Sequence, residues 1–207
     1  MPTQVQVFPS ITIPVPFDAI YRRLGYKRGI TQVDKRSGEE IERHIDHALS
    51  LISLKGAGRR VLLRDVTPRG VVLETGGEFR SGNLARFLKG CGEVLLMGAT
   101  AGDAVMESIR HDTEEEKMTR GVVMDAAASE MADAALDWIA GYYSHQLTRE
   151  NARLTQGRFS AGYGDFLLEN QMIMHNLLEL DRIGVGISDS CILIPEKSVT
   201  AVMGIQR

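Results

Sequence analysis

Cysteine is scarce in this chain of 207 residues, which holds only Cys91 and Cys191. The two lie far apart in the sequence, and neither stands at the spacing of a zinc site. Each flanks an apolar run, which is typical of a buried, reduced thiol in a cytosolic protein. We therefore expect no disulfide between them.

Long apolar runs and a surplus of basic charge are missing too. No stretch approaches the roughly 20 apolar residues of a membrane span, and residues 1–8 lack the basic and apolar regions of a signal peptide. The chain carries 24 Lys and Arg against 27 Asp and Glu, which gives a net charge of −3. Because nucleic-acid binding depends on neutralising phosphates, these features favour a cytoplasmic protein that binds neither membranes nor nucleic acids.

Motifs of common enzyme classes are also absent. The sequence has no GxSxG, GxxxxGK[ST] or HExxH motif, and no glycine-rich Rossmann loop followed by an acid. His44 and His47 lie three apart without a third ligand nearby, so we interpret them, like the acidic run 114–116, as solvated surface. The stretch 98–102 is more typical of a tight strand-to-helix turn than of an anion-binding loop. We predict no catalytic residue and no metal site.

The sequence does contain the patterns of an α+β domain. Hydrophobic residues make up 43%, enough for a substantial core. Helical periodicity predicts helices at 18–24, 37–54, 81–89, 103–110, 119–146 and 167–182. β-rich runs predict strands at 60–66, 70–75, 93–99, 185–194 and 198–205, with 5–15, among prolines, as an extended edge segment. Their irregular alternation favours one domain over 1–207 with a mostly antiparallel sheet, an N-terminal lobe over 1–80 and a core over 81–207.

The helix at 119–146 is the longest of these elements. Seven alanines lie between positions 126 and 140, so other backbones can approach it closely. We expect it to be central and to bury one apolar stripe, made by Val123, Ala127, Met131, Ala134, Trp138 and Tyr142. Elsewhere, Gly56 and Gly58 are predicted to end the helix at 37–54, and 111–117 to form a charged surface stretch.

The segment 157–165 contains three glycines and no periodicity, which predicts a flexible loop. Arg158 precedes Gly162 by four residues and Tyr163 by five. Arginine grips a carboxylate with two parallel hydrogen bonds, glycine lets the backbone approach a ligand, and tyrosine offers a flat face and a hydroxyl. On these residues alone, both a ligand clamp and a plain surface loop with a packed tyrosine remain open.

From Arg158 onward the sequence resembles the C-terminal activation domain of cobalamin-dependent methionine synthase. That domain carries an Arg-x-x-x-Gly-Tyr loop, a helix, an IGV-x-[LI]-[ST]-[ED]-S strand, a proline and an SV-[ST] strand. This chain has the loop at 158–163, then a helix, then matching residues at 183–190, Pro195 and 198–200. Segments 95–102 and the alanine-rich helix are similar as well, and stand-alone versions of the domain resemble the whole chain, including 21–26 and 87–91.

The resemblance implies the role of that domain. It binds S-adenosylmethionine and holds the methyl group over the cobalt of an oxidised cobalamin, which a flavodoxin-like donor reduces by one electron. Cobalamin would be carried by a separate methionine synthase subunit. The sulfonium is already an activated methyl donor, so the protein has to position it and exclude water rather than supply a base. The implied ligand-binding residues are Arg158 at the methionine carboxylate, Ser160, Ala161 and Gly162 along the ligand, Tyr163 against it, and Asp133 facing an ammonium or hydroxyl.

The sequence departs from the family pattern at three places. Asp133 stands where the family has a glutamate, Asp18 is the candidate for its N-terminal aspartate, and the sequence ends at Arg207, before the position of the family's second tyrosine. These departures keep a second hypothesis open, a non-catalytic module that caps a corrinoid protein with little affinity for S-adenosylmethionine. An unrelated methyltransferase is disfavoured because the Rossmann loop is missing.

Overall fold

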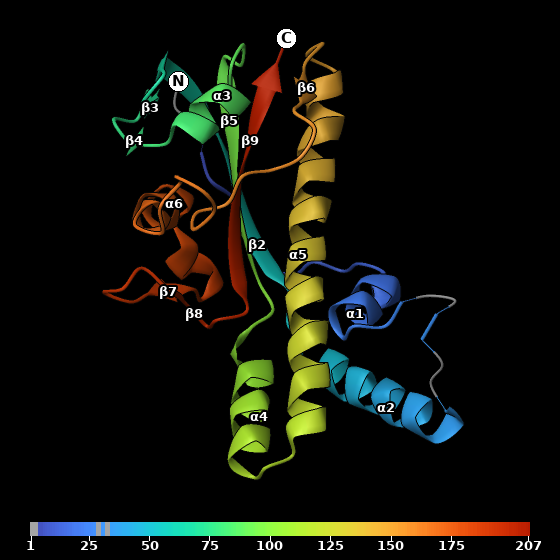
Figure 1. Ribbon diagram of the computed structural model, residues 1–207. Coiled ribbons are helices and arrows are strands. Elements are labelled where there is room, and N and C mark those ends of the chain that lie inside the picture. Colours follow the sequence, from blue (N-terminus) through green and yellow to red (C-terminus); the bar gives the residue numbers. More distant parts are fainter. Residues whose placement is uncertain (1–3, 28–29, 32–33) are drawn as a thin grey trace.

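The computed structural model describes residues 4–27, 30–31 and 34–207, and an antiparallel sheet runs through its centre (Figure 1). Seven strands take part, in the order β4-β3-β2-β5-β9-β6, with β1 beside β2. All their pairings are antiparallel, which confirms the predicted α+β fold. The strands are β1 (Gln6–Phe8), β2 (Lys55–Thr67), β3 (Gly70–Leu73), β4 (Glu78–Phe79), β5 (Glu93–Thr100), β6 (Arg153–Leu154) and β9 (Ser198–Gln206).

Helices cover both faces of the sheet, and each face has its own hydrophobic core. One face carries α5 (Met118–Thr148), with α1 (Phe17–Arg23), α2 (Lys35–Leu51) and α4 (Asp103–Glu114) packed against it (Figure 1). The other face carries α3 (Gly82–Phe87), α6 (Asn170–Leu178), a 3₁₀ turn (Leu180–Ile183) and the hairpin of β7 (Gly186–Ile187) and β8 (Leu193–Ile194). In the described part of the chain, no helix is both long and apolar enough to cross a bilayer.

Strand β5 contributes to both cores. Leu95, Met97 and Ala99 enter the core beneath α5, while Val94 and Leu96 enter the opposite core. Successive side chains of a strand point to opposite faces, so a strand that is covered on both sides has to be apolar throughout. The predicted buried strand at 93–99 is confirmed, and it lies between β2 and β9.

Helix α5 is the long central helix that the alanine-rich pattern predicted, but its buried stripe differs in the second half. Val123, Ala127 and Met131 are buried as expected. Further along, Trp138 is exposed, Ala134 and Tyr142 are half-buried, and the buried positions are Ala135, Leu136, Ile139 and Tyr143. The first half is enclosed by α2 and α4 as well as by the sheet, whereas the second half buries only the side that faces the sheet (Figure 1).

Gly56 and Gly58 do not end α2, because that helix already stops at Leu51. Both glycines lie in β2, which starts earlier than predicted. A Cβ atom at Gly56 would lie 2.6 Å from Cδ1 of Ile139, and one at Gly58 would lie 2.5 Å from Cε2 of Tyr143. Both distances are shorter than real carbon contacts, so the absent side chains let α5 approach the sheet. Glycine also ends helices, which made the sequence signal ambiguous.

The predicted helix at 167–182 is broken in two. Helix α6 ends at Leu178, Glu179 has a left-handed φ of 51°, and a 3₁₀ turn follows. Leu178 and Leu180 are both buried in the same core. Residues two apart face different sides of a continuous α-helix, so the break allows both side chains to be buried. The next predicted strand, 185–194, folds back on itself as the β7–β8 hairpin instead of joining the main sheet.

The charged stretch 111–117 is only partly a surface. Residues 114–116 are exposed as predicted, but Asp112 is fully buried. Its Oδ2 lies 3.0 Å from Nε of Arg120, and Nη2 of Arg120 lies 2.7 Å from Nε2 of His47. His47 therefore belongs to a polar cluster that joins α2, α4 and α5, and the prediction of a solvated face for it is wrong.

The two cysteines are free, as predicted, although neither is fully buried. Cys91 follows α3, and burial raises the pKa of its thiol. Cys191 lies in the connection between β7 and β8, where it has a left-handed φ of 63°. The two thiols thus lie in different connecting segments on the same face of the sheet.

Candidate functional site

The loop that the sequence singled out begins along the edge of the sheet. After β6 the chain continues beside β9, where the Thr155 N–H donates to the Gly204 carbonyl (2.9 Å) and Phe159 and Val202 exchange two hydrogen bonds (2.9 and 2.7 Å). Successive side chains therefore point to opposite faces of the sheet. Arg158 points toward α5, and Phe159 points toward the other core. The first half of the predicted flexible loop is held as a strand-like edge.

Arg158 contacts two carboxylates of α5. Its Nη2 lies 2.9 Å from Oδ2 of Asp133, and its Nη1 contacts Oδ1 of Asp137. The side chain of Arg158 is 25% exposed, whereas those of Asp133 and Asp137 are 45% and 72% exposed. The structure thus brings together the two charged residues that the resemblance implied, Arg158 and Asp133. It adds Asp137, which sequence reasoning missed although the four-residue spacing from Asp133 places both on one side of a helix.

Gly162 and Tyr163 form the turn at the tip of the loop. Gly162 has a φ of +91°, which favours glycine, and its N–H donates to the Phe166 carbonyl (2.7 Å). Tyr163 is 71% exposed, which argues against the packed tyrosine of the plain-loop alternative. Between Arg158 and this turn, the N–H groups of Ser160 and Ala161 have no acceptor among the described residues. The tip therefore combines two N–H groups that have no partner in the described residues with an exposed aromatic face.

Asp165 anchors the far end of the loop to α3. Its carboxylate accepts hydrogen bonds from the hydroxyl of Ser81 and from the N–H groups of Gly82 (2.8 Å) and Asn83 (3.1 Å). The bond from Ser81 holds the pKa of Asp165 below its ordinary value. The stabilisation is therefore present above the ordinary pKa of aspartate and is lost as the pH falls through the lowered value. The loop is fixed at β9 and at α3, and its tip lies between these two anchors.

We expect Ser81→Ala to destabilise the protein through this anchor. Ser81 caps α3 by accepting from the Leu84 N–H (2.9 Å), and the same hydroxyl donates to Asp165. Losing an N-cap costs about 1 kcal/mol of unfolding free energy, or roughly 2–4 °C in melting temperature for a chain of this size. Thermal denaturation measures the effect. Ser50→Ala is the matched control because Ser50 only donates to a carbonyl of its own exposed helix end, so equal shifts in both variants would contradict the prediction.

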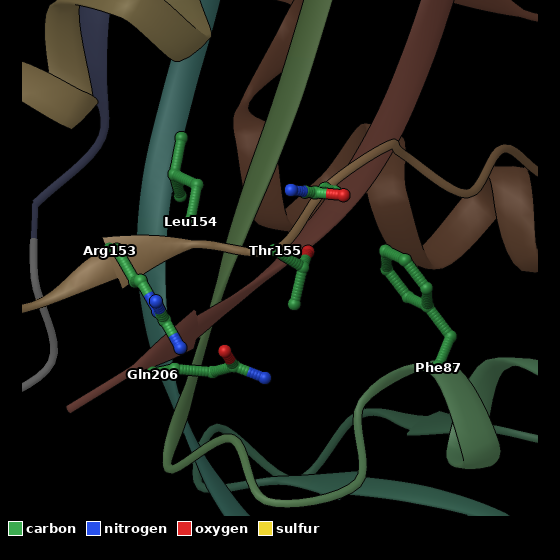
Figure 2. A pocket seen from close by; sticks show the side chains of 6 residues that line it. Phe87, Arg153, Leu154, Thr155 and Gln206 are labelled. Atoms are coloured by element: carbon green, nitrogen blue, oxygen red, sulfur yellow. The ribbon is translucent and has the colours of Figure 1, made fainter.

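A hollow beside the loop was not predicted. It has a volume of about 420 Å³ and is lined by Phe87, Arg153, Leu154, Thr155, Gln156 and Gln206. Figure 2 shows Phe87 of α3 on one side of it, with Arg153 and Gln206 close together across the space. The ring of Phe87 lies 5.6 Å from that of Phe159, so the hollow adjoins the loop. The resemblance covered Phe87 without giving it a role, and the other lining residues, four polar ones and Leu154, follow no pattern in the sequence.

Two remaining candidates, Asp18 and the turn at Gly102, lie at the starts of α1 and α4. Asp18 is in the first turn of α1, and α1 reaches α5 through an ion pair of Arg23 with Glu130 (2.6 Å), less than one turn before Asp133. Gly102 has a φ of +89° and immediately precedes α4, which confirms the predicted strand-to-helix turn. Among the residues that the structure describes, no group of three or more histidines, cysteines and acids could hold a metal ion.

The comparisons with known proteins address the fold. No family model and no curated protein matches this chain. Among solved structures, a crystal structure of the MetH reactivation domain bound to AdoHcy superposes with a TM-score of 0.67, covering 97% of this chain and 78% of that one. The chain has the fold of that reactivation domain. At 12% identity the likeness concerns the fold alone, and it confirms the architecture that the sequence motifs implied.

Proposed function

We propose that this chain binds S-adenosylmethionine and supports the reductive methylation of cob(II)alamin on a separate cobalamin-dependent methionine synthase. The observation that carries the proposal is its MetH reactivation-domain fold, together with an Arg158–Tyr163 loop that lies against α5. The matching MetH domain was crystallised with AdoHcy, the demethylated form of S-adenosylmethionine. Fold and loop chemistry therefore point to the same class of ligand.

The charges around Arg158 suit this ligand. S-adenosylmethionine carries one carboxylate, one ammonium and one sulfonium, so its net charge is positive. Arg158, Asp133 and Asp137 together carry one positive and two negative charges, and both carboxylates contact the guanidinium. Opposite net charges attract, and the arrangement offers a cation for the ligand's carboxylate and an anion for its ammonium.

Each residue then has a positioning task. The guanidinium fork of Arg158 holds the carboxylate, and Asp133 accepts from the ammonium. The N–H groups of Ser160 and Ala161 donate to polar atoms along the adenosine, and the exposed ring of Tyr163 covers one of its faces. Bound there, S-adenosylmethionine supplies a methyl group that its sulfonium has already activated. The chain therefore needs to orient groups and exclude water, and no side chain has to move a proton.

Reactivation also needs a cobalt centre and a source of one electron. The cobalt would be presented by a cobalamin-binding methionine synthase subunit, and the electron by a flavodoxin-like or other low-potential donor. The exposed tip supports this division, because Tyr163 is joined at the surface by Leu167 and Leu168. An exposed apolar patch beside a ligand loop suits contact with another protein.

Titration calorimetry with S-adenosylmethionine tests the proposal most directly. We expect saturable binding of one ligand per chain. A second experiment adds the chain to a methionine synthase held in the cob(II)alamin state, with reductant and S-adenosylmethionine, and follows methylcobalamin by its absorbance. An unchanged rate of methylation with and without the chain would contradict the proposed role.

The chain alone should not bind cobalamin. The Asp-x-His-x-x-Gly signature of corrinoid carriers is absent from the sequence. We therefore expect the visible spectrum of cobalamin to stay unchanged when the purified chain is added in excess. A shift of the cobalt absorption bands during that titration would show that the proposed division of labour is wrong.

A second function is favoured by one observation. Both Nη atoms of Arg158 already contact carboxylates, so a ligand carboxylate competes with internal partners. A chain with such an occupied anchor could cap a corrinoid protein without useful affinity for S-adenosylmethionine. Calorimetry separates the two functions, because a capping module binds the partner protein but gives no heat with S-adenosylmethionine.

A further inference from the structure

The contacts of Arg158 with two aspartates affect which ligands can bind it. Asp133 and Asp137 divide the guanidinium between them, one carboxylate on each Nη atom. A ligand carboxylate that binds through two parallel hydrogen bonds needs N–H groups on one edge of the guanidinium. The two aspartates contact Nη1 and Nη2, so a ligand carboxylate that binds through the edge between these atoms competes with them.

Asp137 is the aspartate that can leave more easily. Its side chain is 72% exposed, against 45% for Asp133, so its carboxylate regains water at little cost. Asp133 is the more enclosed of the two and stays beside Arg158. Its contact with Arg158 would leave it beside the ammonium of an amino-acid ligand whose carboxylate binds the guanidinium.

We propose that Asp137 is a specificity-determining residue that competes with the ligand's carboxylate for Arg158. This inference rests on the proposed function and deepens it. In the free protein the Asp137 carboxylate occupies the guanidinium, and the carboxylate of the ligand replaces it on binding. Asp137 thereby holds the cation in place beside α5 and lowers the affinity for every ligand that needs the same contact. Adenosine compounds without an amino-acid carboxylate do not compete with it.

The experiment compares two neutral-sulfur ligands, S-adenosylhomocysteine and 5′-methylthioadenosine. Both contain the adenosine and a thioether, but only the first has the amino-acid end, and neither has the sulfonium charge. Asp137→Asn removes the competing charge and keeps the size of the side chain. Asp125→Asn is the matched control because it removes the same charge from the same helix, where Asp125 pairs with Lys197 (2.6 Å) and not with Arg158.

We expect Asp137→Asn to lower the dissociation constant of S-adenosylhomocysteine about 2- to 5-fold, the range of an exposed ion pair. The constant for 5′-methylthioadenosine should not change, and Asp125→Asn should change neither. The gain should shrink in 1 M salt, where the screening length is about 3 Å. Thermal melts of both variants check that the fold is kept.

The outcomes separate this inference from the proposed function. If wild type and Asp137→Asn bind S-adenosylhomocysteine equally, Asp137 is not a competitor, and the proposed function stands. If both ligands gain equally, the effect is not directed at the carboxylate, and the inference is again wrong. If neither protein binds S-adenosylhomocysteine or S-adenosylmethionine at millimolar concentration, the proposed function itself fails, and the inference fails with it.

Discussion

Arg158→Ala should weaken the binding of S-adenosylmethionine about 10- to 150-fold. Hydrogen bonds to charged groups contribute roughly 1.5–3 kcal/mol each, and about 1.4 kcal/mol corresponds to a tenfold change in affinity. Because Arg158 exchanges Asp137 for the ligand's carboxylate, part of that contribution is offset, and we expect the lower half of the range. The variant also leaves Asp133 and Asp137 without their cation, so the ligand carboxylate meets repulsion as well.

Two further variants make this result specific. Arg158→Lys should recover only part of the affinity, because an ammonium cannot reproduce the planar fork. Arg153→Ala should leave affinity unchanged, since Arg153 lines the hollow near β6 and is exposed there. The fold should survive all three changes, since exposed ion pairs contribute about 0–1 kcal/mol. Equal affinities for wild type, Arg158→Ala and Arg158→Lys would show that Arg158 is not part of the site. Most of the support for the proposed function would then be lost.

The part of the candidate site that lies within one short segment could be predicted from the sequence. Arg158, Gly162 and Tyr163 are close in the chain, so their spacing indicated a loop and left a ligand clamp open as one of two interpretations. Asp133 entered through the resemblance, and the structure then placed it 2.9 Å from Arg158. Asp137 and the hollow around Phe87 were missed because they depend on how α5, α3 and the β6–β9 edge come together. A pattern along the sequence does not indicate how close residues of different elements come in the fold.

The fold shows the same division between local and long-range information. Strand β5 and helix α5 were predictable because their burial leaves a local sequence pattern. The strand has a continuous apolar run, and the helix is rich in alanine. The break at Glu179 was not, since it follows from the need to bury Leu178 and Leu180 in one core. Gly56 and Gly58 were misinterpreted because the reason for them lies on α5, far along the chain.

Gly58→Val should destabilise the protein by about 1–3 kcal/mol of unfolding free energy, the usual cost of overpacking a core. The added Cβ would lie 2.5 Å from Cε2 of Tyr143, and that ring cannot swing into solvent because it is buried in the core beneath α5. The same burial raises the pKa of Tyr143 to about 12. Valine favours strands, but that preference spans only about 1 kcal/mol and does not offset the clash. Denaturant unfolding followed by circular dichroism measures the loss.

The variant should also affect the ligand site, because α5 carries both Tyr143 and the aspartates that meet Arg158. Pushing α5 from the sheet moves Asp133 and Asp137 relative to the β9 edge, so affinity for S-adenosylmethionine should fall together with stability. Gly141→Ala is the control on the same helix: no atom lies within 4 Å of its added Cβ, and replacing a helical glycine should stabilise the protein by about 0.5–1 kcal/mol. A Gly58→Val protein as stable as wild type would show that α5 does not need this close approach. Opposite signs in the two variants would establish that contact with α5, and not glycine as such, sets the requirement at position 58.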